Sequence, residues 1–404
     1  MSTSLLYHAF GVRGYRYVRQ SFGKDGIEFT IEQDRCELRC SACGSWEVQA
    51  KGRIPREFKT LPIGGKPVSL AFEVPRVECA DCGCRRQVKL GFADARVSYT
   101  RAFARYALEL SRHMTIQDVA DHLLVSWDVI KEIQREDLQR RFSRPKLKKL
   151  RQIAIDEISI GKGHRYLTVV MDLQSGAVLF VGDGKGADAL LPFWRSLRAS
   201  HAKVRAVAID MSAAYINAVT TYLKKAVIVF DHFHVIKLYN EKLSDLRRDV
   251  YRDLTDSIQR EILKGTRWLL LKNPENLDLE KNEEARLDKA LKLNTPLSTA
   301  YYLKEQLRLL WSQENKRQAR RFLKGWLALA EASGIRMLIN FAKTLRLHQE
   351  GILNYYSYRI STGPLEGTNN KIKTMKRQAY GFRDREFFKL KILGIHETRY
   401  ALVG

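Results

Sequence analysis

The sequence predicts a multidomain α+β protein. Its 404 residues exceed one ordinary domain, which usually holds roughly 100–200 residues. Three observations indicate this class: all six cysteines lie in a strand-rich stretch near the start, apolar strands alternate with helices in the middle, and amphipathic helices dominate much of the second half. Hydrophobic residues make up 45% and charged residues 28% of the chain, values typical of a folded rather than a disordered protein.

The charge of the chain indicates a polyanionic partner. Seventy Lys and Arg residues against 45 Asp and Glu residues give a formal charge of +25. Because the basic residues gather in runs, this excess favours nucleic acid as the partner over a merely basic protein. The chain has no run of about 18 uncharged apolar residues and does not start with the layout of a signal peptide. We therefore expect a cytoplasmic protein, neither membrane-bound nor secreted.

The cysteines predict a structural zinc site. Two pairs have the C-x-x-C-G spacing of a zinc knuckle: Cys40 with Cys43, and Cys79 with Cys82. In each knuckle both thiolates face one point while the Gly takes the tight turn, so two knuckles supply the four sulfurs of a tetrahedral Zn²⁺ site. The segment 44–78 between them is typical of a strand-rich insert. Disulfides are the alternative, although nothing indicates an oxidising compartment, and Cys36 and Cys84 are left over.

A helix-turn-helix is predicted after the cysteines. One helical face carries Ile116, Val119, Ala120 and Leu123. Leu124 and Val125 interrupt that pattern, and Ser126 is suited to cap a second helix with an apolar side made of Val129, Ile130 and Ile133. A plain helical hairpin is the alternative, but the following basic run 140–151 favours DNA. Pro145 inside that run suggests a linker, so we expect a domain boundary near residue 145.

The next stretch predicts an α/β sheet with acids at its strand ends. Three apolar strands follow one another, and two more alternate with helices, in the order β-β-β-α-β-α-β. This is a ribonuclease-H-like order, in which the first and fourth strands lie side by side. Asp156 interrupts the first strand and Asp210 ends the fourth. Since an unpaired carboxylate in an apolar strand is costly, we interpret both as ligands of Mg²⁺ or Mn²⁺, with a structural salt bridge as the alternative.

Polar residues also follow the fifth strand, near the predicted metal site. Asp231 and His234 belong to the motif DHFH, and His234 is suited either to position a phosphate or water or to a structural hydrogen bond. Glu157, next to Asp156, is expected to point to the opposite face of the sheet and not to bind metal.

A helical segment and a last helix complete the chain. Residues 236–350 have the pattern of amphipathic helices, and three of their tryptophans are expected in the core rather than stacked on bases: Trp268, Trp311 and Trp326. The last helix has Ser361 or Thr362 as its expected cap and Pro364 in its first turn.

The last helix presents a carboxylate followed by amides and cations. Glu366 opens a face that continues through Asn369 or Asn370, Lys373 and Arg377. Such a face is suited to ligate metal at one end and grip phosphates along the rest, whereas an ordinary exposed Glu at a helix start is the alternative. Residues 371–391 carry eight Lys or Arg residues with interleaved aromatics, a pattern that favours DNA: Tyr380, Phe382, Phe387 and Phe388.

Several long motifs have a family likeness. They are CSACGS, CADCGC, IAIDE, VAIDMSAAY, VFDHFHVIKLYN, KGTRWLLLKNPENL and STGPLEGTNNKIKTMKRQAYGFRD. With them the chain resembles, over nearly its whole length, the DDE transposases of the prokaryotic ISL-three insertion-sequence family. The resemblance fits a zinc ribbon, a helix-turn-helix, a ribonuclease-H-like catalytic domain and an all-helical insertion within it. We expect these at 1–97, at 98–145, at 146–235 together with 351–404, and at 236–350 respectively.

The resemblance implies a chemistry and its residues. The family's acidic triad falls on Asp156, Asp210 and Glu366. Such a triad holds two Mg²⁺ or Mn²⁺ ions about 3.5–4 Å apart for in-line displacement at phosphorus. Water first frees a 3′-hydroxyl at the end of the element, and that hydroxyl then attacks target DNA. Asp156 is expected to bridge both ions, with one ion held mainly by each of the other two acids.

Recognition of DNA is expected elsewhere in the chain. The zinc ribbon and helix-turn-helix would bind the terminal inverted repeats, with phosphate or base contacts from Lys131, Arg135, Arg140 and Arg141. Pairing two element ends implies a homodimer or higher oligomer on DNA, associated with the nucleoid. The alternatives are a non-enzymatic zinc-ribbon and helix-turn-helix DNA-binding regulator, which the intact triad disfavours, and a ribonuclease-H-type nuclease that cuts without joining.

Overall fold

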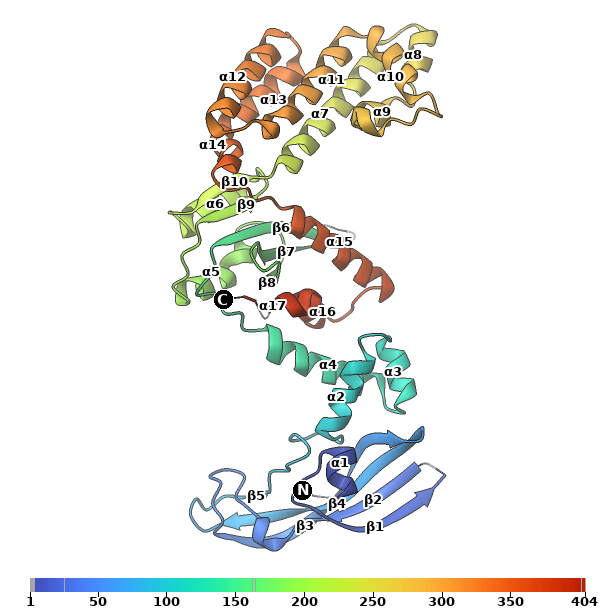
Figure 1. Ribbon diagram of the computed structural model, residues 1–404, viewed down its shortest axis with the longest axis vertical. Helices are drawn as coiled ribbons and strands as arrows, with labels where there is room; N and C mark the ends of the chain where they lie inside the picture. Colours follow the sequence, from blue (N-terminus) through green and yellow to red (C-terminus); the bar gives the residue numbers. More distant parts are fainter. Residues whose placement is uncertain (1–3, 25, 162, 164, 401, 404) are drawn as a thin grey trace. The chain divides into compact units, whose positions relative to one another are not determined.

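The computed structural model describes residues 4–24, 26–161, 163, 165–400 and 402–403 (Figure 1). The chain forms two compact units, 1–140 and 141–404, which divide inside helix α4 (Trp127–Phe142). Residues 1–3, 401 and 404, which belong to the first and last expected domains, lie outside the described part. None of the described helices has the length and apolar character needed to cross a membrane.

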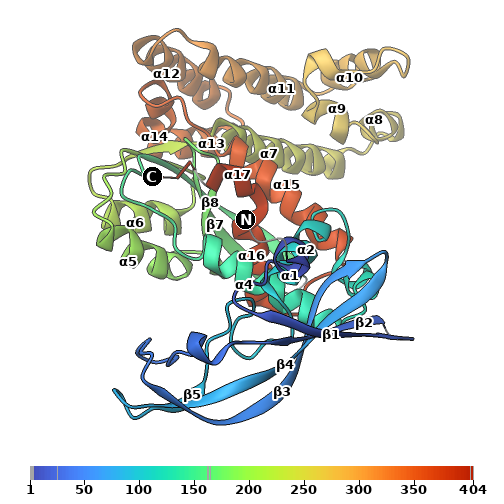
Figure 2. The same cartoon turned by 60° about the horizontal axis from the view of Figure 1, so that its bottom comes forward.

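The first unit begins with a five-stranded sheet and one short helix. The strands run in the order β1-β2-β4-β3, with β5 paired to β4, and Figure 2 shows the long β3–β4 pair. Helix α1 (Leu5–Phe10) packs on one face, where the apolar residues of alternate strand positions form the core, among them Phe29, Phe58, Leu70 and Phe72. The strands are β1 (Arg16–Gly23), β2 (Gly26–Glu32), β3 (Val48–Ile63), β4 (Lys66–Cys79) and β5 (Arg85–Gln87).

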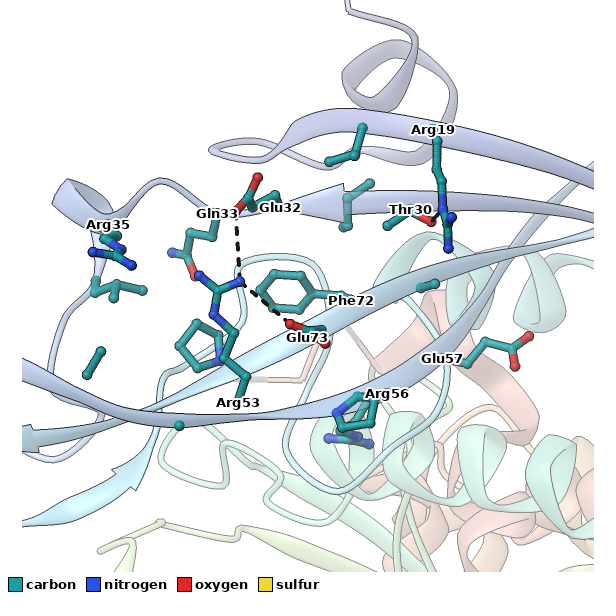
Figure 3. A pocket seen from close by; sticks show the side chains of 18 of the residues that line it. Arg19, Thr30, Glu32, Gln33, Arg35, Arg53, Arg56, Glu57, Phe72 and Glu73 are labelled. Carbon is teal, nitrogen blue, oxygen red and sulfur yellow. Dashed lines mark hydrogen bonds and ion pairs between the residues drawn. The ribbon is translucent and has the colours of Figure 1, made fainter.

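A hollow of about 630 Å³ lies on this sheet (Figure 3). Its lining includes four arginines and four glutamates: Arg19, Arg35, Arg53, Arg56, Glu28, Glu32, Glu57 and Glu73. The Arg53 guanidinium lies 3.8 Å from the Glu32 carboxylate and 3.6 Å from that of Glu73. The four arginines and four glutamates balance in charge, so the lining has no excess of positive charge.

Three helices complete the first unit and confirm the predicted helix-turn-helix. They are α2 (Arg101–Leu110), α3 (Ile116–His122) and α4. The predicted apolar faces meet in one core, with Val119, Ala120, Leu123, Ile130 and Ile133 all buried against Phe103 and Ala107 of α2. A capping box starts α3, in which the Thr115 hydroxyl and the Asp118 carboxylate each accept a hydrogen bond from the other residue's backbone N–H.

The second unit contains the predicted strand and helix order. Its sheet has the order β10-β9-β6-β7-β8, in which β6, β7 and β8 are antiparallel while β9 and β10 run parallel to β6. Helices α5 (Leu191–Ala199) and α6 (Ala213–Tyr222) cover one face of the sheet, whereas α15 (Gly363–Gln378) and α16 (Arg385–Leu393) cover the other. The strands are β6 (Gln152–Gly161), β7 (Arg165–Asp172), β8 (Val178–Asp183), β9 (Ala206–Ile209) and β10 (Val227–Phe230).

Helices fill the chain between β10 and α15. The long α7 is followed by α8 to α14, which pack with it around a continuous apolar core (Figure 1). Their bounds are α7 (His232–Asp253), α8 (Ser257–Leu263), α9 (Arg267–Leu271), α10 (Glu283–Lys292), α11 (Thr295–Arg308), α12 (Lys316–Ala332), α13 (Arg336–Leu347) and α14 (Gln349–Leu353). A last short helix, α17 (Glu397–Tyr400), follows α16.

The tryptophans of these helices differ from the expectation. Trp326 is buried as predicted and donates its indole N–H to the Leu303 carbonyl over 2.8 Å, and Trp311 is partly buried against the same core. The prediction is wrong for Trp268, whose exposed fraction is 64%. The short helix α9 turns Leu269 and Leu270 into the core, which leaves the indole outside, where the Arg267 guanidinium lies over it at 4.9 Å.

Candidate active site and zinc centre

Strand β6 presents Asp156 to the face covered by α15. Ala154 and Ile158 share that face and its apolar cluster, whereas Ile153 and Ile155 alternate onto the face beneath α5 and α6. Glu157 lies on the latter face, as expected, and accepts a 3.1 Å hydrogen bond from the hydroxyl of Tyr215 on α6. The two adjacent acids therefore have different surroundings.

Asp156 and Asp210 are neighbours across two paired strands. Ala154 of β6 pairs with Ala208 of the parallel β9, so continuing that register brings Asp210 alongside Asp156. Burial raises the pKa of the Asp156 carboxyl, and the negative charge of Asp210 raises it further. The Asp210 carboxylate also accepts a 3.0 Å hydrogen bond from the backbone N–H of Ser212, which fixes one of its oxygens at the end of the strand.

Helix α15 carries Glu366 in its first turn and is fastened to β6. The Asn369 side chain, one turn further on, donates a 2.8 Å hydrogen bond to Oδ2 of Asp156. The Lys376 ammonium donates to the carbonyl of Ile160 near the other end of the strand. Among the described residues, four cysteines are the only group of possible metal ligands whose ligand atoms all lie within 4.8 Å of one another. The carboxylate oxygens of Asp156, Asp210 and Glu366 are therefore farther apart than that.

A buried acid–histidine pair connects the sheet with α15. Asp231 follows β10, is 2% exposed, and has Oδ2 within 3.2 Å of Nδ1 of His234 and 2.7 Å of the Thr362 hydroxyl. Burial works to raise the pKa of Asp231, but the hydrogen bonds from His234 and Thr362 lower it below its ordinary value. The bond to Asp231 raises the pKa of His234 against the effect of burial, and the negative charges of Asp156 and Asp210 raise it further.

Thr362, just before α15, and Asn369 within it make contacts that the sequence did not predict. Thr362 occupies the expected cap position, but its hydroxyl makes no helix-cap hydrogen bond and donates to Asp231 instead. Asn369 does not share the exposed face of Lys373 and Arg377, because it is 5% exposed and hydrogen-bonded to Asp156. The packing of α15 against β6 therefore turns Asn369 inward and leaves the next residue, Asn370, outside.

The four predicted cysteines form a cluster. Their sulfur atoms all lie within 4.8 Å of one another, with 3.6 Å between Cys40 and Cys82 and 3.5 Å between Cys43 and Cys79. Backbone amides of Cys43 and Ala42 lower the pKa of the Cys40 thiol to about 6, which favours the thiolate that binds metal. Four converging sulfurs suit a structural Zn²⁺, and Cys36 and Cys84 are not members of the group.

The basic residues of α4 stand beside acids on the helix surface. Arg135 pairs with Glu132 at 3.2 Å, Arg140 pairs with Asp137 at 2.5 Å, and Arg141 pairs with Glu397 of the second unit's C-terminal part. Surface pairs of this kind contribute only about 0–1 kcal/mol each.

Sequence reasoning overlooked one exposed residue at the start of α4. Trp127 is 41% exposed, and the Lys131 ammonium lies 5.2 Å from the centre of its ring. The first residues of the second helix of a helix-turn-helix are those that reach base edges. A tryptophan directly after the predicted helix cap, Ser126, was the feature of the sequence that could have marked this position as a DNA contact.

The aromatics after α15 are mainly core residues. Phe387 and Phe388 are 2% and 3% exposed, so the interpretation of these rings as DNA-facing is wrong for both. Phe388 packs in the apolar cluster between α16 and the sheet, and the Phe387 ring centre lies 6.4 Å from that of Phe382. Tyr380, in contrast, is fully exposed in the turn after α15.

Known proteins resemble this chain in all three of its parts. Residues 153–392 match the family model of ISL3-type DDE enzymes, described as a transposase. Residues 88–136 match the helix-turn-helix domain of transposase family ISL3, and residues 37–82 match the zinc-finger of the transposases of IS204, IS1001, IS1096 and IS1165.

Curated relatives cover nearly the full length. The transposase for insertion sequence element IS1001 of Bordetella parapertussis is 35% identical over 95% of both chains. The transposase for IS1557 of Mycobacterium tuberculosis is 30% identical over 91% of this chain and 87% of its own. A Drosophila P element transposase strand transfer complex overlaps 76% of this chain and 94% of its own at 13% identity, with a TM-score of 0.38, which is too low to support a statement about fold. The family models and the two full-length relatives show that this chain belongs to the ISL3 family of DDE transposases.

Proposed function

We propose that this transposase cuts the ends of its insertion sequence and joins them to target DNA at a site formed by Asp156, Asp210 and Glu366. The observation that carries the proposal is the position of the half-buried Asp156 within the electrostatic reach of Asp210 on the neighbouring strand and in hydrogen-bond contact with Asn369 of α15, the helix that bears Glu366. The sheet order supports a ribonuclease-H-like catalytic domain at 146–235 and 351–404, with the helices of 236–350 as an insertion. Water attacks the phosphodiester at the end of the element, which leaves a 5′-phosphate on the flanking strand and frees a 3′-hydroxyl. That hydroxyl then attacks a phosphodiester of the target and displaces the target's own 3′-oxygen.

The carboxylates fit divalent cations. Burial and the charge of Asp210 raise the pKa of Asp156, so a bound cation would relieve the cost of keeping this carboxylate charged, and hard oxygen ligands suit Mg²⁺ or Mn²⁺. Two such ions, when bound, supply a stronger nucleophile and stabilise charge on the attacking and leaving oxygens. Asp156 is proposed as the shared ligand, because it neighbours Asp210 and is hydrogen-bonded to Asn369 of the helix that carries Glu366; Asp210 and Glu366 would each hold mainly one ion.

Asp231 and His234 support this site without binding metal. The hydrogen bond from Thr362 ties the start of α15 to Asp231, and thereby fixes the helix that carries Glu366. Asp231 holds Nδ1 of His234, so the other ring nitrogen is available to a phosphate or a water near the carboxylates.

DNA recognition in this proposal belongs to the N-terminal part of the chain, through α4. The zinc ribbon at 1–97 and the helix-turn-helix at 98–145 bind the terminal inverted repeats, with contacts from four residues of α4: Lys131, Arg135, Arg140 and Arg141. The exposed Lys373 and Arg377 of α15 contact phosphates near the cleaved bond. Two subunits or more hold two ends together, in the bacterial cytoplasm at the nucleoid.

End cleavage by purified protein tests this function. The protein and its Asp210→Ala variant are incubated with labelled element-end DNA and Mg²⁺ or Mn²⁺, followed by an unlabelled target plasmid. Metal-dependent cleavage by the wild type, with joined products and no activity in the variant, is the expected result. Cleavage that never yields joined products indicates a nuclease, and tight binding by both proteins without cleavage, even with two ends supplied together, indicates a regulator.

A further inference from the structure

Asn369 is a buried amide beside the proposed metal site. It lies one helical turn after Glu366 on α15 and is 5% exposed, whereas its neighbour Asn370 is exposed. Side-chain amides are costly to bury unless their donors and acceptors are used. The position of Asn369 therefore needs a chemical reason that helix periodicity alone does not supply.

The carboxylate of Asp156 fixes the direction of this amide. An ionised carboxylate only accepts hydrogen bonds, so Asn369 must turn its NH₂ group toward Oδ2 of Asp156, at 2.8 Å. Its carbonyl oxygen, Oδ1, then faces the other way. That oxygen is buried, and no hydrogen-bond donor reaches it from the described residues.

Nδ2 of Asn369 therefore has a hydrogen-bond partner, whereas Oδ1 has none among the described residues. The missing partner must be a donor, and it must reach the buried Oδ1 of a residue whose Nδ2 already bonds Asp156. Water bound to a divalent cation is a strong donor, because the cation polarises its O–H bonds. Groups that orient a metal-binding carboxylate or accept from metal-bound water tune metal affinity without touching the ion.

We propose that Asn369 is a positioning residue that orients Asp156 through Nδ2 and accepts a hydrogen bond through Oδ1 from water on the divalent cation held by Asp156. This proposal rests on the proposed function of the three acids. It assigns Asn369 to the metal site rather than to DNA phosphates.

Mn²⁺ binding to the zinc-loaded, DNA-free chain tests the proposal directly. The free Mn²⁺ signal is followed by electron paramagnetic resonance for the wild type, for Asn369→Leu, which keeps the volume but removes the amide, and for Asn369→Ala, which cannot overpack the site. Gln378→Leu is the matched control, because it removes an exposed side-chain amide at the far end of the same helix, outside the proposed metal- and phosphate-binding residues. Melting temperatures without Mn²⁺ and binding to element-end DNA are measured for every variant.

The expected result is a loss of Mn²⁺ affinity by about 10- to 100-fold in both Asn369 variants. The metal concentration for half-maximal end cleavage rises by the same factor, DNA binding stays unchanged, and Gln378→Leu behaves as the wild type. Folded Asn369 variants with unchanged Mn²⁺ affinity would show that the amide merely fastens α15 to β6, and so would overturn the proposal. An equal loss in Gln378→Leu overturns it as well.

The Asp210→Ala variant distinguishes a failure of the proposed role of Asn369 from a failure of the proposed carboxylate metal site. When Mn²⁺ binding by the wild type disappears in Asp210→Ala but persists in the Asn369 variants, the carboxylate site stands and the role of Asn369 fails. When the wild type itself shows no Mn²⁺ binding that depends on Asp210, the proposed metal site fails, and the role of Asn369 fails with it.

Discussion

The Thr362 hydroxyl donates a 2.7 Å hydrogen bond to the carboxylate of Asp231, and both residues are buried, at 1% and 2% exposure. Thr362 directly precedes α15, whereas Asp231 directly follows β10. The bond therefore joins the start of the helix that carries Glu366 to the end of the sheet that carries Asp210, across the whole helical segment between them in sequence. Its loss is expected to loosen the geometry of the acids.

Replacing Thr362 by Val tests this link. The change keeps the shape but leaves Asp231 with one donor fewer, so we expect the free energy of unfolding to fall by about 1–3 kcal/mol. Urea denaturation measures the change. Ser361→Ala is the matched control, because the Ser361 hydroxyl only accepts a 3.3 Å bond from the backbone N–H of Gly363. Equal stability of both variants would contradict the importance of the link.

The Asp231–His234 pair predicts a pH-dependent stability. The pKa of His234 is raised, so its contribution is complete below about pH 6.5, its unfolded-state value, and is lost as pH rises through the folded-state pKa. The pKa of Asp231 is lowered, so its contribution is present above about pH 3.9 and is lost as pH falls through the folded-state pKa. The gap in melting temperature between wild type and His234→Gln is thus expected to be widest between about pH 4 and 6.5.

A scanning fluorimetry series from acid to alkaline pH measures that gap. A gap that stays constant with pH would mean that the ring contributes only packing. The Tyr215 contact to Glu157 lies on the other face of the sheet, so Tyr215→Phe serves as a comparison whose effect does not follow the titration of His234.

Asp156→Asn is expected to separate stability from activity. Burial and the charge of Asp210 raise the pKa of Asp156, so a neutral amide relieves repulsion, and the variant melts at the same or a higher temperature in buffer without Mg²⁺ or Mn²⁺. End cleavage is expected to fall by about a thousandfold or more, since metal ions supply several kcal/mol of transition-state stabilisation. Scanning fluorimetry and the end-cleavage assay measure both. A clear loss of stability without metal would refute the repulsion argument.

The cysteine cluster predicts that zinc supports end recognition. Cys43→Ser removes one of four converging sulfurs, so we expect loss of bound zinc, a lower melting temperature and weaker specific binding to element ends. Zinc content is measured by mass spectrometry and binding by gel shift. Cys36→Ser is the control, since Cys36 is exposed and outside the cluster. Full zinc content in Cys43→Ser would argue for a different ligand set.

Trp127 is expected to determine part of the DNA sequence preference. Its exposed ring starts the second helix of the helix-turn-helix, so Trp127→Ala should reduce binding to element ends by about 1–3 kcal/mol and spare non-specific binding. Fluorescence anisotropy with specific and scrambled duplexes measures both affinities. Gln139→Ala, an exposed change near the other end of α4, is expected to have little effect. A uniform loss on both duplexes would assign Trp127 to backbone contacts.

Local patterns in the sequence determined most of the architecture. Apolar strand and helix patterns predicted the element order β-β-β-α-β-α-β, helical periodicity predicted the apolar faces of α3 and α4, and the two knuckles predicted the sulfur cluster. These features depend on residues close together in the chain, because spacing alone decides which side chains share a face or a turn. The same argument placed Asp156 and Glu157 on opposite faces of β6.

Tertiary packing decided which of these side chains meet. Asn369 and Asn370 stand three and four positions after Glu366, so both are near its face in a helix, and only the contact of α15 with β6 buries the first and exposes the second. Thr362 stands at the cap position of α15, but its hydroxyl donates to the carboxylate of Asp231, which is remote in sequence, instead of capping the helix. Trp268 and Phe387 differ for the same reason: burial depends on which remote segment covers a residue, and the free energy of that contact is not encoded in local spacing.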